Sequence, residues 1–122
     1  MGKHVLLIED EPNIIEAIRF ILERDGWTVS THSDGADAVD IVDREGPDIV
    51  ILDVMLPNRS GYDILRDLRA AEGTAALPVL LLTAKGQSRD REMAETYGAS
   101  RFMTKPFSNQ EVLDSVRDLV AS

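Results

Sequence analysis

Three short runs of apolar residues recur along the chain. Each holds four residues with no polar alternation, which is typical of strands buried on both faces in the centre of a parallel sheet. The runs are Val5–Ile8, Ile49–Leu52 and Val79–Leu82. Two weaker segments, Trp27–His32 and Arg101–Thr104, mix apolar and polar residues and predict half-exposed edge strands.

Segments with helical spacing follow these strands. Apolar residues recur every three or four positions and form one stripe on each helix. The stripes lie within Ile14–Leu22, Ala38–Val42, Ile64–Leu68 and Val112–Val120. The alternation predicts an α/β fold of the flavodoxin-like kind, a doubly wound five-stranded parallel sheet of strand order 2-1-3-4-5 with five helices.

The remaining helix, Gln87–Tyr97, has little apolar surface. Its candidates for burial are Met93, Ala94 and Tyr97, among many charged neighbours. An ordinary solvated surface helix is the commoner interpretation of such a composition. Weakly anchored elements also move most readily, so this helix is a candidate moving part.

Polar side chains stand where four of the predicted strands end. They are Glu9 and Asp10 after the first strand, Asp53 after the third, Thr83 after the fourth and Lys105 after the fifth. In an open α/β sheet, ligands bind beyond the carboxyl ends of the strands. We therefore expect these side chains to converge on one edge of the sheet.

The convergence predicts phosphoryl transfer at a metal site. Three carboxylates in one pocket repel one another unless positive charge compensates them, and Mg²⁺ is commonly held by one or two carboxylates with waters. Lys105 adds a second positive charge, so that Asp53 stays ionised and its oxygen can attack phosphorus. Thr83 offers a hydroxyl donor to a phosphoryl oxygen.

Each residue also has a plainer interpretation when it is taken alone. Asp53 could cap its strand, Thr83 could begin a helix, and Lys105 could be a solvated surface charge. Glu9 and Asp10 could simply favour the positive N-terminus of the following helix. Their joint position at the ends of four strands favours the functional interpretation.

Length and composition fit one domain over residues 1–122. The formal net charge of −9 argues against direct binding of nucleic acid. The chain has no apolar run long enough to span a bilayer, so we expect no membrane partner. The absence of cysteine does not identify the compartment, but it fits the reducing cytoplasm in which we expect the protein.

The motifs resemble the receiver domain of two-component response regulators over essentially the whole chain. The resemblance rests on Val5–Glu11, Ile51–Pro57, Leu82–Ala84 and Lys105–Phe107. It implies phosphorylation by a histidine kinase or a histidine phosphotransfer protein, in a domain that promotes its own phosphorylation and dephosphorylation and is not otherwise an enzyme. Up to Pro57 the sequence is most similar to receivers of winged-helix transcription factors.

The resemblance also assigns roles to residues. It implies that Asp53 is phosphorylated, and that Asp10, Asp53 and the backbone carbonyl of Met55 ligate Mg²⁺, while Glu9 completes the pocket through water. Thr83 and Lys105 are then the contacts of the phosphoryl group, and the Lys105–Pro106 bond is cis. Thr83 drawn toward the phosphoryl group lets the Phe102 ring change rotamer, and the Gln87–Tyr97 helix adjusts.

The apolar side chain of Met55 cannot orient an attacking water and can obstruct it, which predicts slow self-dephosphorylation. Lys85, two residues after Thr83, could attract that water or block its approach.

Two other classes of protein share parts of this pattern. A phosphatase of the haloacid dehalogenase type needs a second carboxylate two residues after the nucleophile, where this chain has Met55. A flavodoxin-like flavin binder needs a Ser/Thr/Gly loop after the first strand, where the acidic Glu9–Pro12 would repel a phosphate.

The expected output face lies on the fourth helix, fifth strand and fifth helix. In the receivers that the chain resembles, charge pairs across this face hold a two-fold dimer. One such pair persists as Arg91 and Glu111, whereas Tyr97, Arg101 and Ser115 replace residues of other pairs. We therefore expect a monomer or weak dimer, with Tyr97 and Arg101 as contacts for a downstream protein or output domain. A single-domain regulator and a fragment cut at a domain boundary both fit this sequence.

Overall fold

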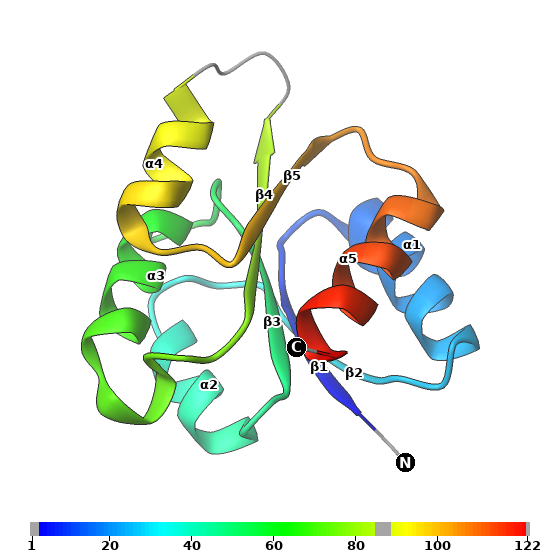
Figure 1. The fold of residues 1–122 in the computed structure, drawn as a ribbon, viewed down its shortest axis with the longest axis horizontal. Coiled ribbons are helices and arrows are strands. Elements are labelled where there is room, and N and C mark those ends of the chain that lie inside the picture. Colours follow the sequence, from blue (N-terminus) through cyan, green and yellow to red (C-terminus); the bar gives the residue numbers. More distant parts are fainter. Residues whose placement is uncertain (1–2, 85–88, 122) are drawn as a thin grey trace.

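The computed structural model describes residues 3–84 and 89–121 and contains a five-stranded parallel sheet (Figure 1). The strand order β2-β1-β3-β4-β5 confirms the predicted order. The strands are β1 (His4–Ile8), β2 (Thr28–His32), β3 (Ile49–Asp53), β4 (Val79–Ala84) and β5 (Arg101–Lys105). Their ends differ from the prediction by one or two residues.

Five α-helices cover the two faces of the sheet, with α1 and α5 on one face and α2, α3 and α4 on the other (Figure 1). They are α1 (Pro12–Arg24), α2 (Ala38–Glu45), α3 (Gly61–Ala70), α4 (Arg89–Tyr97) and α5 (Asn109–Ala121), with the short 3₁₀ helix η1 (Glu72–Thr74) after α3. Positions 87 and 88 of the predicted fourth helix lie outside the described residues. None of these helices is long and apolar enough to cross a bilayer.

The three central strands supply both halves of the core, as their apolar runs predicted. Val5 and Leu7 point to the core under α1 and α5, whereas Leu6 and Ile8 point to the core under α2, α3 and α4. All four side chains are fully buried. Because each such burial stabilises the fold by about 1.5–3 kcal/mol, the central strands form the best anchored part of the molecule. The edge strands β2 and β5 are partly exposed, also as predicted.

The parallel register brings the predicted site residues to one edge. Ile8 is the partner of Leu52, so that Glu9 and Asp53 follow side by side. Asp53 on β3 is the partner of Leu82 on β4. At the other edge of β4, Ala84 is the partner of Lys105 on β5. The carboxyl ends of β1, β3, β4 and β5 thus carry the candidate chemistry together.

Helix α4 packs through few apolar residues, as predicted. Ala94 is buried, Met93 is half-buried, and the ring of Tyr97 lies 5.6 Å from the ring of Tyr62 on α3. The guanidinium of Arg69 on α3 donates a hydrogen bond to the carbonyl oxygen of Gly98 at 2.8 Å. The C-terminal end of α4 is therefore tied to α3.

Candidate functional site

Three carboxylates meet at the carboxyl edge of the sheet. Glu9, Asp10 and Asp53 each offer an oxygen within 4.8 Å of the other two. Glu9 and Asp53 are 0% and 2% exposed, respectively, whereas Asp10 is exposed. The cluster is therefore buried at its base and open to solvent through Asp10.

The carboxylate of Glu9 lacks sufficient positive charge around it. Its Oε2 accepts hydrogen bonds from the backbone N–H groups of Asp10 and Glu11, both at 3.1 Å. Its Oε1 lies 3.2 Å from the Lys105 ammonium, but no described residue donates a hydrogen bond of good geometry to that oxygen. Burial and the nearby charge of Asp53 raise the pKa of Glu9 from 4.5 to about 7.

Lys105 links the buried carboxylates. Its Nζ lies 3.1 Å from Oδ1 of Asp53 and 3.2 Å from Oε1 of Glu9. Burial opposes the charge on this ammonium, but Asp53 and Glu9 outweigh that effect and raise the pKa of Lys105. The Lys105–Pro106 peptide bond is cis, as the resemblance implied.

The residues at the site fit a hard divalent cation. Mg²⁺ prefers oxygen ligands, and the three carboxylates supply them, including the buried oxygen of Glu9 that receives no hydrogen bond from the described residues. A cation there would also lower the raised pKa of Glu9, because positive charge favours the ionised carboxylate.

The chain around Asp53 is held closely. Its Oδ1 accepts a hydrogen bond from the backbone N–H of Met55 at 3.2 Å. A Cβ on Gly61, the first residue of α3, would lie 2.3 Å from the backbone oxygen of Asp53. Glycine is therefore required where α3 begins. Met55 is 72% exposed, two residues after Asp53.

Thr83 and Phe102 lie on neighbouring strands beside this site. Thr83 is 1% exposed, and its Oγ1 is 3.5 Å from the carbonyl oxygen of Met103. Phe102 is half-buried and packs against the core on the α3 and α4 side. A hollow of ≈ 240 Å³ lies next to it between α4 and β5, with Arg91, Ala94 and Arg101 among its lining residues.

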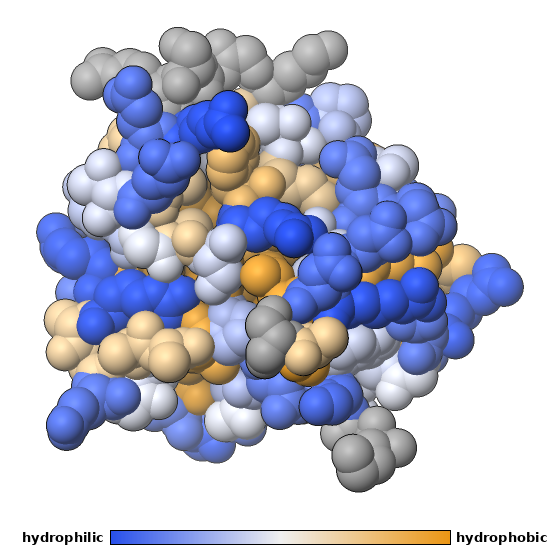
Figure 2. Space-filling view, viewed as in Figure 1, coloured by the Kyte–Doolittle hydropathy of each residue, from blue (hydrophilic) through white to orange (hydrophobic). Residues whose placement is uncertain are grey.

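Four predicted contact residues lie on the α4–β5–α5 face, where polar side chains gather over α4 and α5 with apolar surface between them (Figure 2). Arg91 is exposed, and Tyr97 is half-buried. Arg101 lies 3.5 Å from the carboxylate of Asp118 on α5. Glu111 accepts a hydrogen bond from the backbone N–H of Ser108 at 3.0 Å within the cap of α5.

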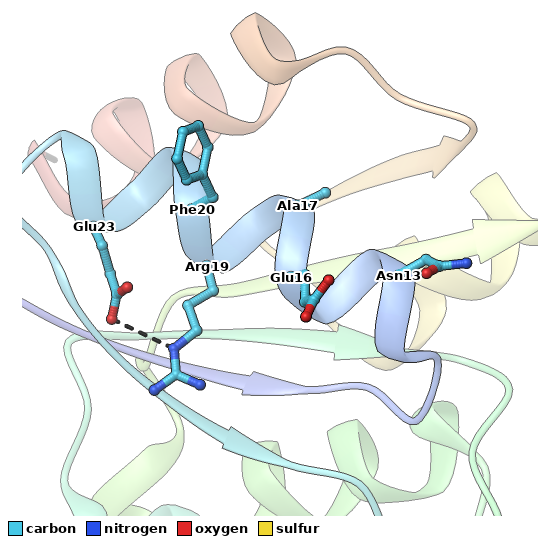
Figure 3. Close-up of a pocket in the computed structure, with 6 residues that line it drawn as sticks. All are labelled: Asn13, Glu16, Ala17, Arg19, Phe20 and Glu23. Atoms are coloured by element: carbon cyan, nitrogen blue, oxygen red, sulfur yellow. Dashed lines mark hydrogen bonds and ion pairs between the residues drawn. The ribbon is translucent and has the colours of Figure 1, made fainter.

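Two open hollows that the sequence did not indicate lie along α1. One, of ≈ 560 Å³, borders Lys105 and is lined also by Ile14, Pro106 and Phe107. The other, of ≈ 630 Å³, is lined by residues of α1 alone, among them Phe20, which is 59% exposed (Figure 3). Neither is lined by the three carboxylates, so both lie outside the carboxylate cluster, and only the first borders a site residue. In the sequence, Phe20 is an aromatic residue outside the apolar stripe of α1, and this position could have indicated an exposed ring.

Residues 33–37 were also not predicted to lie near the site. The loop between β2 and α2 contacts the loop that follows Asp53 through hydrogen bonds from Gly35 to Pro57 and from Asn58 to Asp34. The Asp34-Gly35 pair is a turn signal, but nothing in the sequence indicates which loop the turn contacts.

Comparison with known proteins agrees with this geometry. Residues 5–117 match the family described as the response regulator receiver domain. The chain is 44% identical over 116 residues to the probable transcriptional regulatory protein TcrX of Mycobacterium tuberculosis, covering 95% of this chain and 49% of that protein. It is 38% identical over 120 residues to the alkaline phosphatase synthesis transcriptional regulatory protein PhoP of Bacillus subtilis, covering 98% and 49%. The chain thus spans about half the length of the curated relatives that it matches.

Solved structures give the same result. A crystal structure of a response regulator from Chloroflexus aurantiacus superposes with a TM-score of 0.95 at 29% identity, covering 100% of both chains. The receiver domain of the sensor histidine kinase PA1611 from Pseudomonas aeruginosa, with a magnesium ion coordinated in its active site cleft, superposes with a TM-score of 0.91 at 31% identity, again covering 100% of both chains. This chain therefore belongs to the family of receiver domains of two-component response regulators.

Proposed function

We propose that Asp53 is the phosphoacceptor of this receiver, which forms one domain over residues 1–122. The observation that carries the proposal is the ammonium of Lys105 at 3.1 Å from Asp53, opposite two further carboxylates of the same cluster. Asp10, Asp53 and the backbone carbonyl of Met55 would hold Mg²⁺, and Glu9 would complete the site through water. When bound, Mg²⁺ supplies positive charge that offsets the carboxylates and the incoming phosphoryl group.

The transfer uses the residues of the chain as follows. A carboxylate oxygen of Asp53 attacks phosphorus, and the bond from phosphorus to the donor breaks, so that an acyl phosphate forms. The donor is a phosphorylated histidine of a kinase or phosphotransfer protein, or a small acyl phosphate. Lys105 offsets the charge on the phosphoryl oxygens, and the Thr83 hydroxyl donates a hydrogen bond to one of them.

The signal then passes to the α4–β5–α5 face. Thr83 lies on β4, and Phe102 lies on the neighbouring strand β5, where it is the register partner of Leu81. Phe102 also lines the hollow between α4 and β5, into which we propose that its ring turns. Because α4 packs through few apolar residues, a small energy difference suffices to shift it. We propose that this face contacts a downstream protein or an output domain in the cytoplasm, with Tyr97 and Arg101 among the contacts.

Replacing the proposed phosphoacceptor tests the assignment. The chain incubated with acetyl phosphate and Mg²⁺ should gain the mass of one phosphoryl group, and Asp53→Asn should gain none. Asp10→Asn should weaken Mg²⁺ binding and slow labelling at a fixed Mg²⁺ concentration, because it removes a proposed ligand. Intact-mass spectrometry measures all three proteins. Unchanged labelling of Asp53→Asn would overturn the assignment.

The raised pKa of Glu9 predicts a pH dependence of stability without metal. The folded chain binds this proton more tightly than the unfolded chain, so the free energy of unfolding should fall as pH rises from 4.5 to about 7 and stay lower above that. Glu9→Gln should remove that part of the fall and be more stable than the parent at pH 8 by roughly 1–3 kcal/mol. Urea unfolding with EDTA across pH 5–8 measures it.

Saturating Mg²⁺ is the control for this comparison. Bound Mg²⁺ should stabilise the parent more than it stabilises Glu9→Gln. The difference in the free energy of unfolding between the two proteins at pH 8 should therefore become smaller or change sign. Parallel pH profiles for the two proteins without metal would contradict the account of Glu9.

Position 55 should control the lifetime of the phosphorylated state. Met55 is exposed and lies two residues after Asp53, so its side chain should flank the path of an attacking water, which it cannot orient. Met55→Asn should hydrolyse the acyl phosphate several-fold faster than the parent, because a polar amide can position that water. Phosphate release after removal of the donor gives both rates. An equal or slower rate would refute the steric account. Lys85, which could also influence this step, lies outside the described residues.

Phosphorylation should not drive a tight dimer through the α4–β5–α5 face. Arg101 already lies near Asp118, and Glu111 is engaged in the cap of α5, so fewer charges are free to pair across a two-fold axis. Analytical ultracentrifugation with and without beryllofluoride should show a monomer or weak dimer in both states. A tight beryllofluoride-induced dimer that dissociates in Arg91→Ala or Glu111→Ala would show the opposite.

A further inference from the structure

The loop between β2 and α2 packs against the loop between β3 and α3. The backbone N–H of Gly35 donates a hydrogen bond to the carbonyl oxygen of Pro57 at 3.0 Å. The side-chain amide of Asn58 donates to Oδ2 of Asp34 at 2.9 Å, while Oδ1 of Asp34 accepts from the backbone N–H of Ala36 at 2.8 Å. One carboxylate therefore holds its own loop and the neighbouring loop together.

The two loops approach so closely that Gly35 has no room for a side chain. A Cβ at this position would lie 2.5 Å from the carbonyl oxygen of Arg59 and 2.9 Å from its Cβ. Asn58 has a φ of 69°, in the left-handed region that few residues other than glycine occupy. The hydrogen bond to Asp34 helps to keep the chain in this conformation, which on its own is unfavourable.

Met55 lies between two anchored points of the β3–α3 loop. On one side, the backbone N–H of Val54 donates to the carbonyl oxygen of Leu82 at 3.0 Å, which ties the loop to β4. On the other side, Pro57 accepts the hydrogen bond from Gly35. The path of the backbone through Met55 is therefore set jointly by the sheet and by the β2–α2 loop.

We propose that Asp34 and Gly35 are positioning residues for the magnesium ion, which act by fixing the segment that presents the backbone carbonyl of Met55. The inference rests on the proposed function, because that carbonyl is a ligand only in the proposed site. Outer residues that orient ligands influence metal affinity without touching the metal, typically by 10- to 100-fold. The affinity for Mg²⁺ thus depends on a loop that contributes none of the proposed ligands.

Gly35→Ala is the first test. The added methyl group must displace the backbone of Arg59 and the segment before it, so Mg²⁺ binding should weaken about tenfold. The matched control is Gly46→Ala at the end of α2, where φ is 56° and the new Cβ meets open space. This control should lose stability through backbone strain and keep the Mg²⁺ affinity of the parent. Titration of the protein with Mg²⁺, followed by amide NMR shifts, gives the affinities, and urea unfolding gives the stabilities.

An exchange of the Asp34 and Asn58 side chains tests the hydrogen bond between them. It also provides a test of the inference if Gly35→Ala does not fold. Asn58→Asp places two carboxylates opposite each other and should weaken Mg²⁺ binding severalfold, although its added negative charge alone would strengthen it. Asp34→Asn with Asn58→Asp restores one donor and one acceptor and should return the affinity to within about twofold of the parent.

The outcomes separate the inference from the proposed function. A parent chain that binds no Mg²⁺ would overturn the proposed metal site and the inference with it. A parent that binds Mg²⁺ while Gly35→Ala or Asn58→Asp binds it equally well would overturn the inference alone, as would failure of the double exchange to restore the affinity.

Discussion

The buried carboxylates of Glu9 and Asp53 share the ammonium of Lys105, and the organisation of the site depends on this charge balance. The Lys105 Nζ atom lies 3.2 Å from Oε1 of Glu9 and 3.1 Å from Oδ1 of Asp53. Among the described residues, none gives that Glu9 oxygen a well-formed hydrogen bond. Two buried negative charges with one positive charge nearby are unfavourable. The arrangement therefore favours further positive charge near the exposed Asp10, such as the cation of the proposed function.

The sheet makes this charge balance possible. The apolar runs of β1 and β3 are buried on both faces and hold Glu9 and Asp53 beside each other at the ends of adjacent strands. Helix α4 is packed less extensively, because it rests on Ala94, the half-buried Met93, the contact between the rings of Tyr97 and Tyr62, and the hydrogen bond from Arg69 to Gly98 at its end. In the proposed function, a change of charge at Asp53 would therefore act between a firmly packed part of the core and a weakly packed helix.

Much of the fold and of the site could be predicted from the sequence, because the apolar runs indicate the strands and the apolar stripes of helical spacing indicate the helices. Four-residue apolar runs identified the central strands, and the parallel geometry then required the polar residues after them to meet at one edge. The contacts of Asp34 with Asn58 and of Arg101 with Asp118 could not be predicted. The first contact joins two loops and the second joins β5 to α5, so in each case the partners are distant in the sequence. Each of these residues, taken alone, is an ordinary polar surface residue.

Chemical trapping of the phosphorylated residue tests the central claim most directly. Borohydride reduces an aspartyl phosphate to homoserine, and peptide mass spectrometry after reaction with acetyl phosphate identifies the position of the new residue. We expect homoserine at position 53 when Mg²⁺ is present and almost none when EDTA is present. Homoserine at another aspartate, or equal conversion of position 53 in EDTA, would contradict a metal-dependent phosphoacceptor at Asp53.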